Sequence, residues 1–152
     1  MYTGLLHLHS ILRWIVLLLL LVVVFRSMTA GKRPFDASDN RFGLFTLISC
    51  DLQLLVGLYL WLRGAYGLNT IENQPMKDIM TNKVMRFFTI EHLTAMIIAI
   101  VLVHVGRAVA KKNLPDTVKH KRTLIFFGLA LLIILISIPW PFREVGAGRG
   151  WF

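Results

Sequence analysis

The sequence predicts an all-α integral membrane protein, a four-helix bundle of up-down-up-down order with both termini on the outer (periplasmic) side. Three observations predict this class. Of the 152 residues, 56% are hydrophobic and only 16% are charged; four apolar stretches are long enough to cross a bilayer; and Lys and Arg gather in alternate connections. A spanning helix needs about 20 mostly apolar residues. The length allows a single transmembrane domain, residues 1–152.

The four apolar stretches are predicted to be helices, because only helices and closed barrels satisfy their backbone groups in lipid. The first contains the unbroken apolar run 14–25 and has no Lys or Arg before Arg13, so we expect it to remain as a helix and not to be removed as a signal peptide. Pro139 and Pro141 are expected to end the fourth. The predicted spans are residues 5–25, 42–62, 87–106 and 123–142, followed by a Gly-rich tail at 143–152.

Basic residues distinguish the two sides of the predicted bundle. The first and third connections hold ten of them: Arg26, Lys32, Arg33, Arg41, Arg107, Lys111, Lys112, Lys119, Lys121 and Arg122. The second connection and the tail hold six: Arg63, Lys77, Lys83, Arg86, Arg143 and Arg149. The positive-inside rule then places the first and third connections in the cytoplasm. The net charge of +9 is thus read as a topology signal and not as a sign of nucleic-acid binding.

Several function classes are disfavoured by the sequence. Its single cysteine excludes a disulfide framework and CxxC-type metal sites. It shows no nucleophile–base pairing, no Gly-rich phosphate loop and no HExxH motif, so an electron-transfer or accessory protein is favoured over a stand-alone enzyme. The lipid bilayer is the expected partner, with quinone, subunits of a membrane complex or further copies of the chain as candidates.

His9 and His92 lie near the starts of the first and third predicted helices. Both are about 6–8 Å below the same end of the bundle if the helices are regular. Two imidazoles facing each other across a bundle are what b-type haem needs as axial ligands. His7 is an alternative to His9, although it points to a different face. His104 is predicted to lie at the inner interface, and His120 in a solvated loop.

Three arginines are predicted on the same side as His9 and His92. Arg13 shares a helical face with His9, while Arg143 and Arg149 return to that side after the fourth helix. A guanidinium matches a carboxylate with two hydrogen bonds, so these residues are candidate partners of haem propionates. The alternative is that these arginines and the nearby tryptophans are interfacial anchors.

Asp51 lies near the middle of the second predicted helix. A carboxyl at this depth is costly and indicates a functional residue, or a hydrogen-bonded structural one, or one that contacts another subunit. Ser49, Gln53 and Gly57 form a stripe of small and polar residues, which usually packs against a neighbouring helix. The tail 143–152 is either a flexible terminus or a segment folded over the mouth of the bundle.

Four segments together resemble a known family. They are Tyr2–Trp14 (YTGLLHLHSILRW), Arg41–Ser49 (RFGLFTLIS), Glu91–Met96 (EHLTAM) and Ile138–Phe152 (IPWPFREVGAGRGWF). They are similar to small bacterial four-helix integral membrane proteins commonly labelled "cytochrome B", over essentially the whole chain. The resemblance implies a multi-pass protein of the bacterial inner membrane and a b-haem electron carrier. The matching residues are His7, His9, Arg13 and His92, whereas Asp51 stands where the family often has a histidine.

Two functions follow from these observations. The first is a membrane cytochrome with haem b near the outer face, held by His9 and His92, exchanging electrons with a quinol or a periplasmic partner. The second is a non-redox accessory or scaffold subunit of a larger membrane complex, or an oligomeric carrier that uses Asp51.

Overall fold

The structure is a computed structural model of the chain and describes residues 2–148. These residues form helices and connecting turns, with no strand among them. The elements in chain order are α1 (Tyr2–Met28), α2 (Ala37–Arg63), α3 (Leu68–Asn73), α4 (Met76–Thr81), α5 (Lys83–Arg86), the π-helical turn η1 (Phe87–Glu91), α6 (His92–Ala110), α7 (Asp116–Ser137) and the 3₁₀ turn η2 (Glu144–Gly146).

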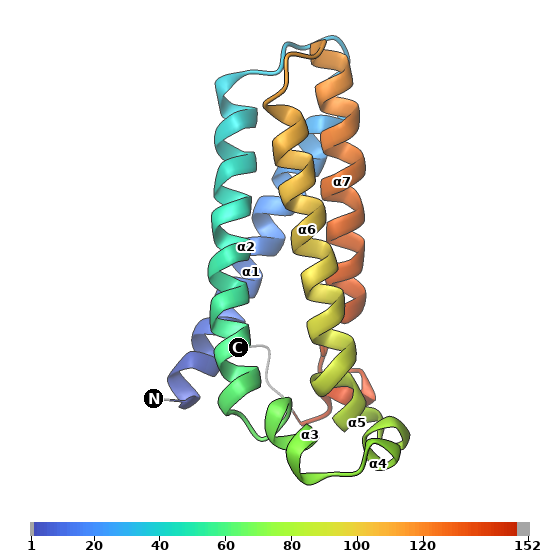
Figure 1. Cartoon of the computed structure of the whole chain (residues 1–152). Helices are drawn as coiled ribbons and strands as arrows, with labels where there is room; N and C mark the ends of the chain where they lie inside the picture. The colour runs from blue at the N-terminus through green and yellow to red at the C-terminus, as the bar shows by residue number, and fades with distance from the viewer. Residues whose placement is uncertain (1, 149–152) are drawn as a thin grey trace.

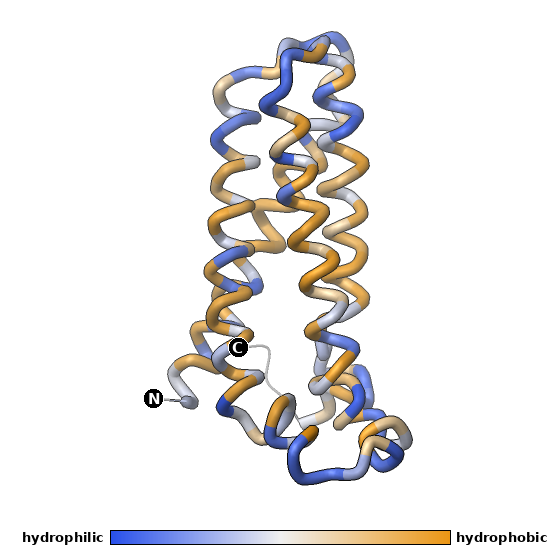
Figure 2. Tube along the Cα trace, in the orientation of Figure 1, coloured by the Kyte–Doolittle hydropathy of each residue, from blue (hydrophilic) through white to orange (hydrophobic). Residues whose placement is uncertain are grey.

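The four long helices form an antiparallel bundle in which α1 packs on α2 and α7, and α6 packs on α7 and α2 (Figure 1). Four helical stretches are long and apolar enough to cross a membrane: Tyr2–Met28, Ala37–Asn73, Lys83–Ala110 and Asp116–Ser137. Figure 2 shows the apolar middle of the bundle and its more hydrophilic ends. The predicted all-helical four-helix bundle is confirmed, and these helices indicate a multi-pass membrane protein.

The two ends of the bundle differ. The end formed by the connections 29–36 and 111–115 is called the basic end below, and the end that carries α3, α4, α5 and η2 is called the cavity end (Figure 1). At the basic end, α2 begins with a reciprocal capping box. The carboxylate of Asp36 accepts a hydrogen bond from the Asp39 amide, and the Asp39 carboxylate accepts one from the Asp36 amide.

The Asp39 carboxylate also ties α1 to this connection. Its oxygens accept hydrogen bonds from Arg33 at 2.7 and 2.9 Å and from Arg26 at 2.8 Å. The paired Asp39 and Asp36 carboxylates raise the pKa of the Arg33 guanidinium. The acidic residues near the basic end therefore neutralise part of its charge and fix the turn between α1 and α2.

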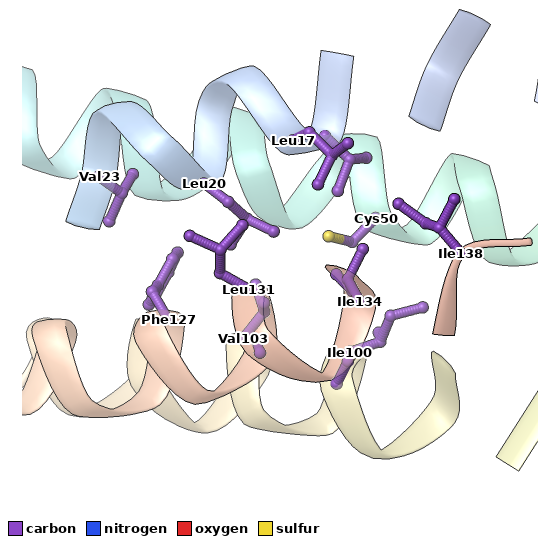
Figure 3. Packing of buried hydrophobic residues seen from close by; sticks show 13 residues of the cluster. Leu17, Leu20, Val23, Cys50, Ile100, Val103, Phe127, Leu131, Ile134 and Ile138 are labelled. Carbon is purple, nitrogen blue, oxygen red and sulfur yellow. The ribbon is translucent and has the colours of Figure 1, made fainter. Parts of the chain in front are cut away.

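The core lies in the middle of the bundle and draws on all four long helices. Figure 3 shows Leu20 of α1, Val103 of α6 and Phe127 of α7 converging, with the thiol of Cys50 directed into the same cluster from α2. Gly106 allows α6 to approach α7, because a Cβ atom there would lie 2.8 Å from atoms of Phe126 and Phe127.

The structure corrects the predicted helix ends and one histidine. Several helices extend beyond the predicted spans. The fourth is shifted: α7 begins at Asp116, seven residues before the predicted start, and ends at Ser137, five residues before the predicted end at 142. The expectation that His120 lies in a solvated loop was wrong. His120 is buried in α7, where its ring packs on Phe35 with centroids 5.0 Å apart.

Candidate cofactor-binding cavity

A cavity opens within the bundle toward its cavity end, between α1, α2, the η1–α6 segment and the chain just after α7. Its volume is about 460 Å³, within the range of about 300–1,000 Å³ that is typical of small-molecule and cofactor sites. The lining residues used below are His7, His9, Arg13, Gln53, Gly57, Trp61, Tyr66, Phe88 and His92. The cavity therefore brings together His9, Arg13 and His92, three of the predicted site residues.

His9 is positioned by α2. Its backbone carbonyl accepts a hydrogen bond of 3.0 Å from Nε2 of Gln53, and its ring lies against Gly57, where a Cβ atom would come within 3.0 Å of Cε1. Gln53 and Gly57 thus contact the neighbouring helix, as the stripe of small and polar residues predicted. Within the described part of the chain, the buried Nδ1 atom of His9 has no hydrogen-bond partner. A buried polar atom of this kind is costly unless a ligand or water satisfies it.

His92 approaches the cavity from the opposite side. Its Nδ1 atom lies 2.8 Å from the carbonyl oxygen of Ser137, at the end of α7. A carbonyl can only accept, so Nδ1 carries the proton and, in the neutral ring, Nε2 keeps its lone pair. A histidine that donates one ring N–H to a backbone carbonyl and offers the other nitrogen is the usual arrangement of a metal ligand.

The π-helical turn η1 immediately precedes His92 and is held by the end of α2 and by the connection between α2 and α3. The indole Nε1 of Trp61 donates a hydrogen bond of 2.9 Å to the carbonyl of Thr89, and the Gly67 amide lies 3.4 Å from the Thr89 hydroxyl. π-Helical turns within α-helices are frequent at functional sites. This turn sets the direction from which His92 enters the cavity.

The arginines have different surroundings. Arg13 lines the cavity, and its guanidinium lies 5.4 Å from the ring centroid of Trp14. Arg143 is not among the described residues that line the cavity. Its guanidinium donates to the carbonyls of Ile136 and Ile138 and lies 5.5 Å from the ring centroid of Phe87. Arg143 therefore satisfies carbonyls at the end of α7, while its predicted role toward a cofactor stays a prediction.

The other candidates are distributed as follows. His7 lines the cavity from the more exposed side of α1. Asp51 is outside the cavity and faces His104 of α6. Arg149 and the tail residues Trp151 and Phe152 lie outside the described residues. Among residues 2–148, no three His, Cys, Asp or Glu side chains come together as a site that could hold a metal ion.

The residues that orient the histidines were not among the predicted site residues. Trp61, Thr89 and Ser137 act through hydrogen bonds between helices, two of them through backbone carbonyls, and a carbonyl leaves no signal in the sequence. The aromatic wall formed by Trp61, Tyr66 and Phe88 had a weak signal, because these aromatic residues cluster where the apolar spans end.

Comparison of the chain with protein-family models, curated proteins and solved structures found no match. The class that the fold and the cavity define is a four-helix membrane protein with a histidine-lined internal cavity. The resemblance to the proteins labelled "cytochrome B" stays a prediction.

Proposed function

We propose that the chain is a small membrane cytochrome-like protein that binds b-type haem in the cavity and transfers electrons. The observation that carries the proposal is that His9 and His92, from two helices on opposite sides, line one cavity of cofactor size. Two further observations support it. The hydrogen bond from His92 Nδ1 to Ser137 leaves Nε2 of the neutral ring available to a ligand, and the buried Nδ1 of His9 has no hydrogen-bond partner among the described residues.

The donor set fits haem b. His9 and His92 would hold the haem iron through ring nitrogens. Arg13 would pair with a propionate, because its guanidinium matches a carboxylate and the cavity is otherwise mostly apolar. Haem, when bound, would supply one-electron redox chemistry. The chain would hold the imidazoles in place through Ser137 and Gly57 and exclude water with Trp61, Tyr66 and Phe88.

The proposal includes an orientation. The basic end faces the cytoplasm of a bacterium and the cavity end faces the periplasm, as the distribution of Lys and Arg favours. The cavity is then near the outer face of the inner membrane, within reach of a quinol or a periplasmic electron-transfer partner. Single cysteines at Lys112 and at Glu72, introduced into a Cys50→Ser chain, should react with an impermeant maleimide from opposite sides. Labelling of Lys112→Cys from the periplasm would contradict the orientation.

Absorption spectroscopy tests the cofactor. The protein, expressed with ample haem supply and purified in mild detergent, should show the sharp reduced α-band of a b-type cytochrome. His92→Ala and His9→Ala should lose that band or bind haem much more weakly. His104→Ala is the matched control, because His104 is a histidine of α6 outside the cavity, and it should keep the band. A colourless wild-type protein, or an unchanged band in His92→Ala, would overturn the proposal.

A further inference from the structure

Asp51 of α2 and His104 of α6 form a polar pair on the outside of the bundle. The carboxylate oxygen Oδ1 lies 3.5 Å from Nε2 of the imidazole. The Asp51 side chain is 42% exposed and the His104 side chain 47% exposed. Cys50, the residue before Asp51, points into the core (Figure 3), and successive residues of a helix point about 100° apart. Asp51 is therefore directed toward the surface of the bundle.

This pair lies at membrane depth. Asp51 is about 21 Å from the start of α2 and about 18 Å from its end, at about 1.5 Å per residue. His104 belongs to the next helix at this surface, and helical side chains lean toward the start of their own helix, which brings it to Asp51. Ionisable side chains in spans are expensive and almost always face protein or a water-filled cavity. A half-exposed pair at this depth thus needs a cover other than lipid.

The contact within one chain leaves the pair only loosely satisfied. The Nδ1 atom of His104 lies 3.0 Å from the carbonyl of Ile100, so Nδ1 carries a proton and donates it there. The separation of 3.5 Å between Oδ1 of Asp51 and Nε2 of His104 exceeds the usual length of a hydrogen bond, about 2.7–3.2 Å.

The surface around the pair is otherwise apolar. It is called the Asp51–His104 seam here and consists of Ile48, Asp51, Leu52 and Leu55 on α2 and Val101, His104, Val105 and Ala108 on α6, all exposed or half-exposed. The nearest basic side chain along α6, Arg107, is buried and donates to Asn40 of α2 at 2.9 Å. Arg107 therefore has a partner of its own, one turn closer to the basic end.

We propose that the Asp51–His104 seam binds a second copy of this chain across a two-fold axis, with Asp51 of each copy facing His104 of the other. Charge complementarity between the acidic and the basic side chain supports this contact between copies. A two-fold interface brings the same patch of both copies together, so residue i meets j and j meets i. The seam holds one acid and one base between apolar side chains, which makes it complementary to itself. This inference does not depend on haem, because neither residue lines the cavity.

Mixing two complementary variants tests the contact between copies. One carries Asp51→Ala and keeps His104, and the other carries His104→Ala and keeps Asp51. Only a mixed dimer contains one intact Asp51–His104 pair, and that pair spans the two copies. With donor and acceptor dyes in liposomes, mixed dimers should form about three- to ten-fold more readily than dimers of either variant alone. Mixed dimers at or below the share expected from random mixing would overturn the proposal.

A matched control and a second measurement complete the test. A pair of α7 surface variants, Leu132→Ala and Ile136→Ala, should mix at random, because these exposed residues lie on a different helix. The wild-type dimer should dissociate on dilution into lipid, and the Asp51→Leu/His104→Leu double variant should be monomeric at dilutions where wild type is dimeric. The helical content of the double variant shows whether that variant folds. Monomeric wild type at every dilution, or capture of a different membrane protein in place of a second copy, would contradict the proposal.

Discussion

The Nδ1 atom of His92 lies 2.8 Å from the carbonyl oxygen of Ser137, which fixes the first residue of α6 to the last residue of α7. The contact determines the tautomer of the ring, since only Nδ1–H can donate to the carbonyl. It also connects two helices beside the cavity. The orientation of His92 is thus set by the folded bundle before any cofactor binds.

We predict from this contact that His92 is protonated at Nδ1 and unprotonated at Nε2 in the haem-free protein. Nitrogen NMR of labelled protein in detergent, assigned by the signals that disappear in His92→Gln, measures the two ring nitrogens directly. Because this experiment uses no haem, it tests the tautomer of the His92 ring independently of whether His92 binds haem. A proton on Nε2 would show that His92 is not arranged as a ligand.

Gly57 provides the space for the His9 ring. We predict that Gly57→Ala displaces this ring by a few tenths of an ångström, because the new Cβ would lie 3.0 Å from Cε1. Haem affinity should fall, since His9 could hold the cofactor only where its imidazole is correctly placed. Gly128→Ala in α7 is the matched control, as a Cβ there meets no atom within 4 Å. Haem titration should separate the two variants, and equal affinities would indicate that His9 is not positioned by this contact.

The sequence was sufficient to predict the four helices, because a continuous apolar run of spanning length satisfies its backbone hydrogen bonds in lipid by forming a helix. It was insufficient for their ends. Hydropathy marks the part of a helix that lies in the apolar layer, whereas α7 begins at Asp116 directly after Pro115, well inside the polar region. For the same reason His120, in a polar sequence, was predicted to be solvated although it packs on Phe35.

The site was predictable only in its simplest part. Helix direction and residue number place His9 and His92 at similar depth, and the structure does bring both to one cavity. Their orientation depends on the Ser137 carbonyl and on the π-helical turn, and neither has a signature in side-chain periodicity. Asp51 was singled out by its cost in lipid, but its partner His104 could be found only once α2 and α6 were placed side by side.

Asp39 is expected to stabilise the basic end of the bundle. Its side chain is only 5% exposed and accepts hydrogen bonds from Arg26 and Arg33. Asp39→Ala should lower the free energy of unfolding by about 1–3 kcal/mol, because it removes the acceptor of three arginine hydrogen bonds and one half of the capping box, and leaves Arg26 and Arg33 with the more exposed carboxylate of Asp36. Lys83→Ala removes an ion pair with Glu144 in which both side chains are more than 60% exposed, and it should cost less than about 0.5 kcal/mol. Unfolding titrations in detergent compare the two, and equal losses would contradict this role.

Trp61 is expected to hold the π-helical turn that precedes His92. Trp61→Phe keeps an aromatic ring in the cavity wall but removes the N–H that donates to the buried Thr89. Without this hydrogen bond the π-helical turn should change conformation and the His92 ring should change orientation, so haem affinity or the reduced spectrum should change. The free energy of unfolding should fall by about 1–3 kcal/mol. Trp140→Phe is the matched control, because it removes a solvent-exposed indole hydrogen bond of the same length, 2.9 Å, from a half-buried tryptophan to the Leu135 carbonyl. Since Trp140 does not hold η1, that variant should retain the wild-type spectrum, and a loss of haem in both variants would mean that Trp61 acts only through general stability.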